Sequence, residues 1–214
     1  MYYGTRAIVF DFGKVLAKFD HMKTCEGLAR FSNLKLDPLE IHKIIFKEGL
    51  EKEYDSGKIS SFDFFIAVRK EINASIKLNY DKFAEIWGNI FTQNDGIEEL
   101  LAKIYPEIRM ILLSNTNELH WKYIKKLSVI ETFFSDPDFL VRSYKEGMRK
   151  PEPGIFHLAI KKAGCPPEQM IYIDDVPEYV NVFRDLGGHG ILYDCTEESI
   201  IDLLKKLQPF GVFI

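Results

Sequence analysis

Five short apolar runs along the chain have the length and composition of strands that are buried on both faces of a parallel sheet. They cover Ala7–Phe10, Arg109–Leu113, Phe139–Val141, Met170–Ile173 and Gly190–Tyr193. Segments with helical spacing separate most of these runs. Capping or first-turn residues predict later helices that begin near Asn117, Pro153, Pro177 and Thr196. This alternation predicts an α/β fold with a three-layer, Rossmann-like parallel sheet core.

The stretch between the first two runs, roughly residues 18 to 93, follows helical spacing instead. One apolar helical face is formed by residues at i, i+3, i+4, i+7 and i+8, namely Phe83, Ile86, Trp87, Ile90 and Phe91. A helix start is indicated by Asp37 as a cap, Pro38 at the first helical position and Glu40 at the third. We read the aromatic residues here as the core of a small helical bundle. The chain is therefore predicted to have a core domain (residues 1–17 and 94–214), interrupted after its first strand by an all-helical cap domain (18–93).

Composition narrows the class of protein. The 214 residues carry a net charge of −4, which argues against a nucleic-acid partner, because such proteins normally present a basic face. No apolar run approaches the length of a membrane span or forms a signal peptide. The three cysteines, Cys25, Cys165 and Cys195, have no metal-binding spacing and suit reduced thiols. We expect a cytoplasmic protein without a membrane partner, and the pattern does not indicate its oligomeric state.

Polar side chains that could carry chemistry stand at the predicted strand ends or at a helix start: Asp11, Ser114, Asn115, Asp174, Asp175 and Lys150. The carboxyl ends of parallel strands meet at one edge of a sheet, where ligands bind, so these residues are expected to converge. Taken singly, an aspartate or serine here could be a helix cap, and a lysine could be an ordinary surface residue. Their combination in this order favours a site.

Three carboxylates in one crevice would repel one another, and a hard divalent cation such as Mg²⁺ removes that conflict. Lys150, the Ser114 hydroxyl and backbone N–H groups could then hold phosphoryl oxygens. Asp11 is placed to form an aspartyl-phosphate, a known kind of carboxylate nucleophilic catalysis. The residues therefore indicate phosphoryl transfer to water from a small phosphorylated substrate.

Four motifs that contain these residues resemble the haloacid dehalogenase superfamily over essentially the whole chain. They are Phe10–Leu16, Leu113–Asn117, Gly147–Glu152 and Ile173–Asp175. The sequences of the second and third motifs are similar to those of bacterial α-glucose-1-phosphate phosphatases and of the phosphatase-like N-terminal domain of soluble epoxide hydrolases. The helical insertion resembles the C1 cap of this superfamily, a lid between the first and second motifs.

The resemblance implies roles for residues that bind the phosphoryl group. Asp11 would be the nucleophile, Ser114 and Lys150 would be catalytic residues that hold the transferring group, and Asn115 would join them in binding substrate.

The resemblance also implies a Mg²⁺ site. Its ligands would be the Asp11 carboxylate, the Gly13 carbonyl and Asp174, with Asp175 acting through a coordinated water or by orienting the site.

One position departs from the superfamily pattern. Most phosphatases of this superfamily carry an aspartate two residues after the nucleophile as general acid–base, and here that residue is Gly13. General acid–base catalysis typically raises the reaction rate by about 10²–10⁴-fold. A leaving group of low pKa would need less of it, or Asp20 or His21 near the cap entrance could move the proton, although a surface or capping role is the more common one for each. Lys14 and Tyr179 also differ from the usual residues, and their roles stay open.

The leading interpretation is a Mg²⁺-dependent phosphatase that acts on a small phosphorylated metabolite, with a sugar phosphate as one candidate. Gly13 motivates an alternative, a catalytically impaired protein of this fold that binds a ligand or regulates a partner. A haloacid-type dehalogenase is disfavoured by Asp174 and Asp175, because displacement of a halide does not need Mg²⁺.

Overall fold

The sheet at the centre of the molecule is parallel throughout. The computed structural model describes residues 4–47 and 49–212. The sheet order is β5-β4-β1-β6-β7, and every neighbouring pair is parallel. The strands are β1 (Ala7–Phe10), β4 (Arg109–Ser114), β5 (Leu140–Arg142), β6 (Met170–Asp174) and β7 (His189–Leu192). Each of the five predicted strands is present, with its ends shifted by at most one residue.

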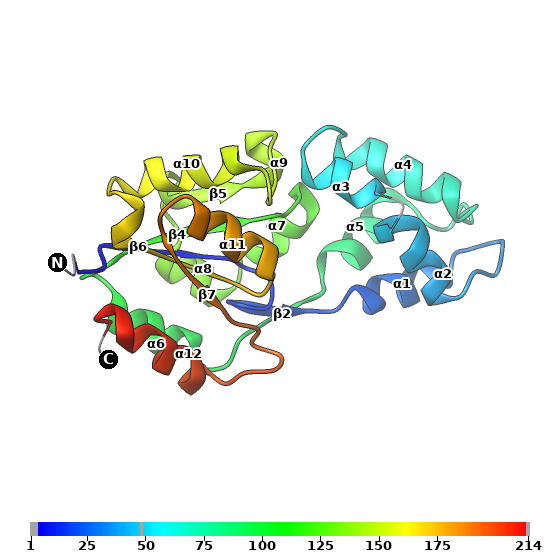
Figure 1. Cartoon of the computed structure of the whole chain (residues 1–214). Coiled ribbons are helices and arrows are strands. Elements are labelled where there is room, and N and C mark those ends of the chain that lie inside the picture. Colours follow the sequence, from blue (N-terminus) through cyan, green and yellow to red (C-terminus); the bar gives the residue numbers. More distant parts are fainter. Residues whose placement is uncertain (1–3, 48, 213–214) are drawn as a thin grey trace.

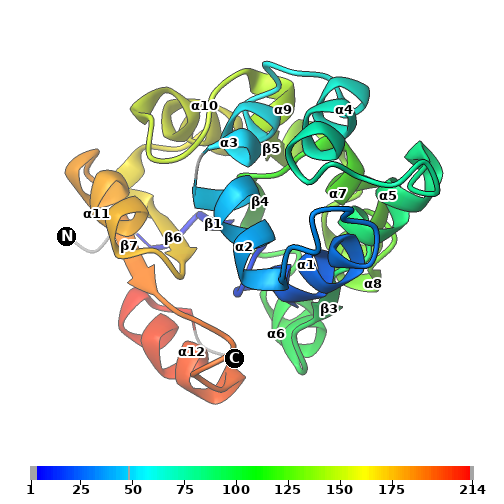
Figure 2. The same ribbon diagram turned by 90° about the vertical axis from the view of Figure 1, so that its right-hand side faces the viewer.

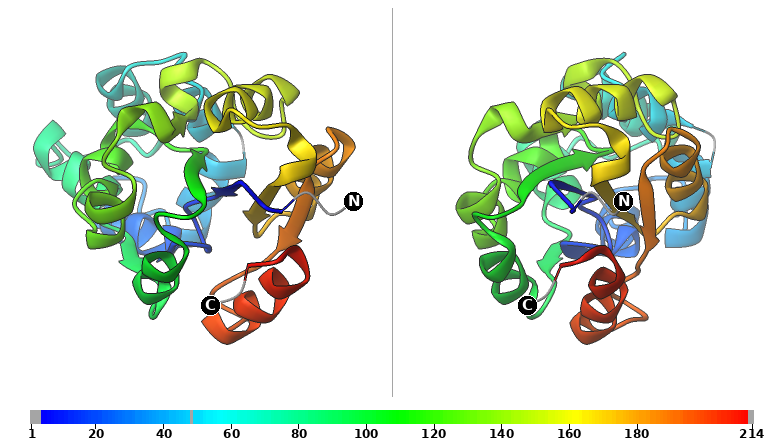
Figure 3. Two further views of the ribbon diagram at one scale, coloured as in Figure 1. Left: turned by 90° about the vertical axis from the view of Figure 1, so that its left-hand side faces the viewer. Right: turned by 60° about the vertical axis from the view of Figure 1, so that its left-hand side comes forward.

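Two helical layers cover the sheet because alternate strand residues point to opposite faces. In β1, Ile8 and Phe10 belong to one apolar cluster, whereas Ala7 and Val9 belong to another on the opposite face. The first face is covered by α6 (Ile97–Ile104), α8 (Ser128–Phe133) and α12 (Ile200–Leu207), and the second by α10 (Pro153–Ala163) and α11 (Pro177–Asp185). Figures 1 and 3 show these layers above and below the sheet. The predicted α/β fold class is confirmed.

Shorter helices complete the α/β part of the chain. They are α7 (Glu118–Ile124) and α9 (Ser143–Glu146), with 3-10 turns at Pro137–Phe139, Pro167–Gln169 and Gln208–Phe210. The predicted start near Thr196 is wrong, because α12 begins at Ile200, where Ser199 and Asp202 form a capping box. Within the described residues, no helix combines the length and apolar character needed to cross a membrane. All three cysteines are free thiols.

The inserted segment is helical and has an apolar cluster of its own. Its elements are α1 (His21–Ala29), α2 (Pro38–His42), a π-helical turn (Lys43–Lys47), α3 (Leu50–Asp55), α4 (Ser61–Glu71) and α5 (Tyr80–Gly88). Asp37 and Glu40 form the expected capping box at the start of α2. Buried rings such as Phe64, Phe83 and Trp87 pack inside this cluster, which lies at the right of Figure 1 and faces the viewer in Figure 2. The separate cluster supports our proposal that residues 18–93 are a distinct cap.

A two-stranded antiparallel pair joins the inserted segment to the rest of the chain. β2 (Ala17–Phe19) pairs with β3 (Phe91–Gln93), with Phe19 opposite Phe91. The prediction that Ile90 and Phe91 continue the helical face is therefore wrong, since α5 ends at Gly88. Helical spacing alone could not reveal this end, because Phe91 is drawn into a strand by a partner far upstream in the sequence. The pair places Phe19 at the junction, close to the end of β1.

Candidate active site

A buried lysine connects two aspartates at the carboxyl edge of the sheet. Asp11 follows β1, Asp174 ends β6, and Lys150 stands just before α10. The Lys150 Nζ atom lies 2.7 Å from Asp11 Oδ1 and 2.6 Å from Asp174 Oδ2, and the residue is only 1% exposed. The structure thus brings together three of the residues that the sequence placed at strand ends and a helix start.

Asp175 adds a third carboxylate to this cluster. Asp11, Asp174 and Asp175 each offer an oxygen, and these oxygens lie within 4.8 Å of one another. Burial raises the pKa of Asp11 to about 7; Lys150 opposes the rise and Asp174 adds to it. Lys150 bonds two of these carboxylates, and the cluster as a whole keeps a surplus of negative charge.

The cluster fits a hard divalent cation. Asp174 accepts hydrogen bonds from Lys150 Nζ, the Tyr172 hydroxyl and the Val176 backbone N–H, and a carboxylate has about four lone-pair sites, so one is left for a metal ion. Gly13, the predicted carbonyl ligand, lines the same cavity as Asp11. Oxygen donors of this kind are the ligands that Mg²⁺ takes in proteins.

Ser114 and Asn115 lie beside the cluster. Ser114 is the last residue of β4 and is 3% exposed. The Asn115 side chain accepts from Lys150 N at 2.8 Å and donates to Lys150 O at 3.1 Å. The Asn115 amide therefore holds the Lys150 backbone in place.

Lys14 and Tyr179, which the sequence left open, have definite places. Lys14 Nζ lies 3.0 Å from Asp194 Oδ2 and 3.6 Å from Asp175 Oδ2, so it is tied to two carboxylates. Tyr179 lines the cavity, and its ring centroid lies 5.2 Å from Lys150 Nζ. Lys14 thus supports Asp175, and Tyr179 covers the buried ammonium.

An aromatic ring fills the space beside Gly13. A Cβ atom added to Gly13 would lie 2.8 Å from Phe19 Cε1, closer than real Cβ contacts. The Phe19 ring in turn packs against the His21 ring, with centroids 4.8 Å apart. The Phe19 ring therefore occupies the space in which an acid–base side chain at position 13 would lie.

A cavity of about 220 Å³ extends from the aspartates to the inserted helices. Its polar lining includes Asp11, Ser114, Lys150, Asp175, His21, Glu51, Asp55, Thr116, His120 and Arg149. The sequence analysis did not predict Thr116, His120 or Arg149 as site residues. It also missed Glu51 and Asp55, the two acids of α3. The i, i+4 spacing of those acids was the signal that could have indicated one shared helical face.

Hydrogen bonds determine the proton position of His120. The Trp87 indole N–H and the His120 backbone N–H can only donate, so the atom of Asn117 that they contact, at 3.2 and 2.9 Å, must be the Oδ1 acceptor. Asn117 Nδ2 then donates to Asp55 Oδ1 and to His120 Nδ1. Burial lowers the pKa of His120 to about 3, with His21 as a further cause. Neutral His120 accordingly carries its proton on Nε2.

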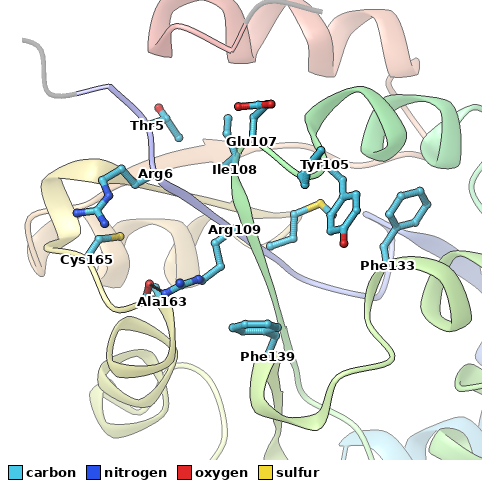
Figure 4. Close-up of a pocket in the computed structure, with 12 residues that line it drawn as sticks. Thr5, Arg6, Tyr105, Glu107, Ile108, Arg109, Phe133, Phe139, Ala163 and Cys165 are labelled. Atoms are coloured by element: carbon cyan, nitrogen blue, oxygen red, sulfur yellow. Dashed lines mark hydrogen bonds between the residues drawn. The ribbon is translucent and has the colours of Figure 1, made fainter.

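A larger cavity, of about 450 Å³, lies at the opposite end of the sheet and is lined by residues such as Arg6 and Arg109 (Figure 4). Both arginines are exposed. Arg109 donates to the Ala163 carbonyl at 2.5 Å and lies 5.6 Å from the centroid of the Phe139 ring. This cavity is at the amino ends of the strands, away from the edge where ligands bind in such sheets.

Comparison with known proteins shows the family of this chain. A family model for haloacid dehalogenase-like hydrolases matches residues 5–180. The chain belongs to this family. The resemblance drawn from the four motifs, and with it the prediction of a hydrolase of this kind, is confirmed.

Relatives within the haloacid dehalogenase-like hydrolases include phosphatases. A D-ribitol-5-phosphate phosphatase from Bacteroides thetaiotaomicron is 26% identical over 190 residues, covering 84% of this chain and 87% of the relative. Bifunctional epoxide hydrolase 2 from Sus scrofa is 35% identical over 68 residues, 32% of this chain and 12% of the relative. A family enzyme from B. thetaiotaomicron, solved with magnesium and inorganic phosphate, superposes with a TM-score of 0.79 at 24% identity, covering 94% and 99% of the two chains. This superposition confirms the fold.

Proposed function

We propose that this hydrolase is a Mg²⁺-dependent phosphatase that acts on a small phosphorylated metabolite through an aspartyl-phosphate on Asp11. The observation that carries the proposal is the buried Lys150, which bonds both Asp11 and Asp174 at the carboxyl edge of the sheet. A cation so placed would bind phosphoryl oxygens beside the attacking carboxylate. The phosphatase among the relatives supports the same chemistry.

The metal ligands would be the carboxylates of Asp11 and Asp174 and the Gly13 carbonyl, with Asp175 behind them. When bound, Mg²⁺ supplies positive charge that neutralises these carboxylates and the phosphoryl oxygens.

The chain's own residues would carry the transfer. Asp11 attacks phosphorus, while Lys150, which holds Asp11 Oδ1, keeps the carboxylate oriented. The Ser114 hydroxyl and Lys150 bind the oxygens of the moving group, so most of the catalysis is positioning and charge stabilisation. Water then hydrolyses the aspartyl-phosphate and restores Asp11.

The cavity favours a small, hydroxyl-bearing substrate. Its volume of about 220 Å³ leaves room for a compact molecule. Beyond the aspartates the wall presents neutral His120, with its proton on Nε2, and the carboxyl groups of Glu51 and Asp55. These donors and acceptors match hydroxyl groups, so we propose sugar or polyol phosphates, the class to which the substrate named for the B. thetaiotaomicron relative belongs.

Gly13 supports a second candidate, a phosphometabolite-binding protein without turnover. That protein would gain thermal stability from phosphate esters but release no phosphate. Haloacid dehalogenation is less favoured, because the group of three carboxylates suits a metal ion that halide displacement does not need. Hydrolysis of a halogenated acid in excess chelator would revive it.

Replacement of the nucleophile tests the proposal. We expect Asp11→Asn to lower Mg²⁺-dependent phosphate release by a factor on the order of 10⁴ or more, because the covalent intermediate cannot form. A panel of sugar phosphates, nucleotides and acyl phosphates, assayed with Mg²⁺ and with EDTA, measures this. Glu107→Gln, which alters a carboxyl group lining the opposite cavity, is the matched control and should keep full activity. Full activity in Asp11→Asn would show that the nucleophile is wrong.

A further inference from the structure

The proposed reaction has an unmet requirement. An alkoxide leaving group of a sugar or polyol phosphate needs a proton as its bond to phosphorus breaks. Gly13 has no carboxyl group to supply it, and the Phe19 ring occupies the space that such a side chain would enter. If the proposed function holds, another group of this cavity must give the proton.

We propose that Glu51 of α3, paired with His21 of α1, is the general acid–base of this hydrolase. The Nε2 atom of His21 lies 3.8 Å from Glu51 Oε1, and both residues line the same cavity as Asp11. The His21 ring also packs on Phe19, the residue that fills the space beside Gly13. His21 therefore packs on the ring that fills the space of the usual acid, and Glu51 lies beside His21.

Packing holds the pair in place. The His21 ring stacks on Phe46 with centroids 4.1 Å apart and an interplanar angle of 12°. The side chains of His21 and Glu51 are 26% and 16% exposed. Both groups are thus largely enclosed and still open to the cavity, as a proton-transfer group requires.

Burial of Glu51 favours its protonated form. Burial raises the pKa of Glu51 well above its usual value and Asp55 adds to the rise, whereas Arg149 and Lys52 oppose it. A carboxyl group with a raised pKa keeps its proton at a higher pH than an ordinary one, as a general acid requires.

Burial keeps the His21 ring neutral. Burial lowers the pKa of His21 to about 4, His42 lowers it further, and Asp20 opposes the shift. At neutral pH the imidazole therefore has no charge, and its Nε2 atom lies 3.8 Å from the Glu51 carboxyl group.

The other candidates for the general acid are held by contacts of their own. Asp20 caps α1 by accepting from Met22 N at 2.8 Å. Asp55 is 5% exposed and accepts a hydrogen bond from Asn117. His120 is clamped between that same asparagine and the Trp87 ring, which stacks on it. Among the described residues of the inserted helices that line this cavity, Glu51 is the carboxyl group left for proton transfer.

Every bond and proton is accounted for in the two steps of the proposed reaction. In the first, Asp11 forms a bond to phosphorus, the bond from phosphorus to the leaving oxygen breaks, and that oxygen takes the proton of Glu51. In the second, the Glu51 carboxylate takes a proton from water as the water oxygen bonds to phosphorus. The bond to Asp11 then breaks, which releases inorganic phosphate and restores both carboxyl groups.

Two substrates that differ in leaving group test the assignment. The first is the alkyl phosphate that the wild type hydrolyses fastest, with D-ribitol 5-phosphate in the panel; the second is p-nitrophenyl phosphate, whose leaving group needs no proton. Under single-turnover conditions we expect Glu51→Gln to slow the alkyl phosphate by about 10²–10⁴-fold. With p-nitrophenyl phosphate in excess, the rate of the initial p-nitrophenolate burst should stay within about threefold of the wild-type rate. Later turnovers should be slower, because hydrolysis of the intermediate needs the base.

Control variants separate this role from a structural one. Glu53→Gln changes an exposed acid of the same helix and should leave both rates unaltered. His21→Asn should shift the limb of the kcat–pH profile that Glu51→Gln removes. Equal loss of both bursts in Glu51→Gln, or no loss with the alkyl phosphate, would overturn the assignment. Absence of Mg²⁺-dependent release from either substrate in the wild type would instead overturn the proposed function.

Discussion

The two ends of the sheet each have a cavity and basic residues, yet they differ in how those residues are held. At the carboxyl end, Lys150 is 1% exposed and bonds two aspartates. At the amino end, Arg109 is exposed and meets a carbonyl oxygen and an aromatic ring. The amino-end cavity is the larger, about 450 Å³ against about 220 Å³.

This difference shows that cavity size does not locate the chemistry. Buried charges are costly unless they are paired, so a chain that buries two carboxylates around one lysine must have a reason beyond stability. Shifted pKa values in a cleft, as for Asp11, are typical of functional sites.

The largest effect on stability should come from the buried lysine at the carboxyl end. Lys150→Met leaves two buried carboxylates without their partner and should lower the free energy of unfolding by about 3–5 kcal/mol. Arg109→Met, the matched change at the amino end, should cost roughly 0–1 kcal/mol. Urea denaturation at pH 7.5 measures both. Similar losses in the two variants would remove the distinction between the ends.

A smaller effect is expected where the carboxyl end is tightly packed. Gly13→Ala places a Cβ atom 2.8 Å from Phe19 Cε1, so the ring must move, at a cost of about 1–3 kcal/mol. Gly4→Ala, where nothing lies within 4 Å of the added atom, should change stability by less than about 0.5 kcal/mol.

The Phe19 contact can be tested directly by a double-mutant cycle. If the ring is the obstacle, Gly13→Ala combined with Phe19→Leu should cost less than the sum of the two single changes. Additive losses in thermal or urea unfolding would show that the strain lies elsewhere.

The smallest effect concerns the buried imidazole of the carboxyl-end cavity. Burial lowers the pKa of His120 to about 3, below the value of about 6.5 in an unfolded chain. The unfolded state therefore binds the proton first, so this residue's contribution to stability is complete above pH 6.5 and is lost as the pH falls toward 3. The wild type should lose about 1 kcal/mol from this source between pH 7.5 and pH 5.5.

His120→Gln removes the titration of this imidazole. The carboxyl groups titrate in both the wild type and the variant, so the difference between the two proteins reports on His120. The difference in unfolding free energy between wild type and variant should shrink by about 1 kcal/mol between the two pH values. A constant difference would mean that His120 is not kept neutral by the fold.

Much of the fold could be predicted from local patterns. The buried strands were found because each is a short apolar run, and the caps at Asp37 and Asn117 were found because their side chains bond backbone groups within the next turn. The β2–β3 pair was missed because Phe91 continues a helical apolar spacing and becomes a strand only through a distant partner.

The candidate site divides in the same way. Asp11 and Asp174 were placed together because parallel strands end at one edge of a sheet. Glu51 and His120 were not, because their approach to the cavity depends on how the inserted helices dock.

By itself, the sequence determined which residues form the strands, which aspartates follow them, and that residue 13 has no carboxyl group. Only the tertiary structure decided that Phe19 fills the space beside Gly13 and that Glu51 and His21 face the cavity behind it. The physical reason is range: strand periodicity and capping act over a few neighbouring residues, whereas these contacts join segments that meet only when the inserted helices pack against the end of the sheet.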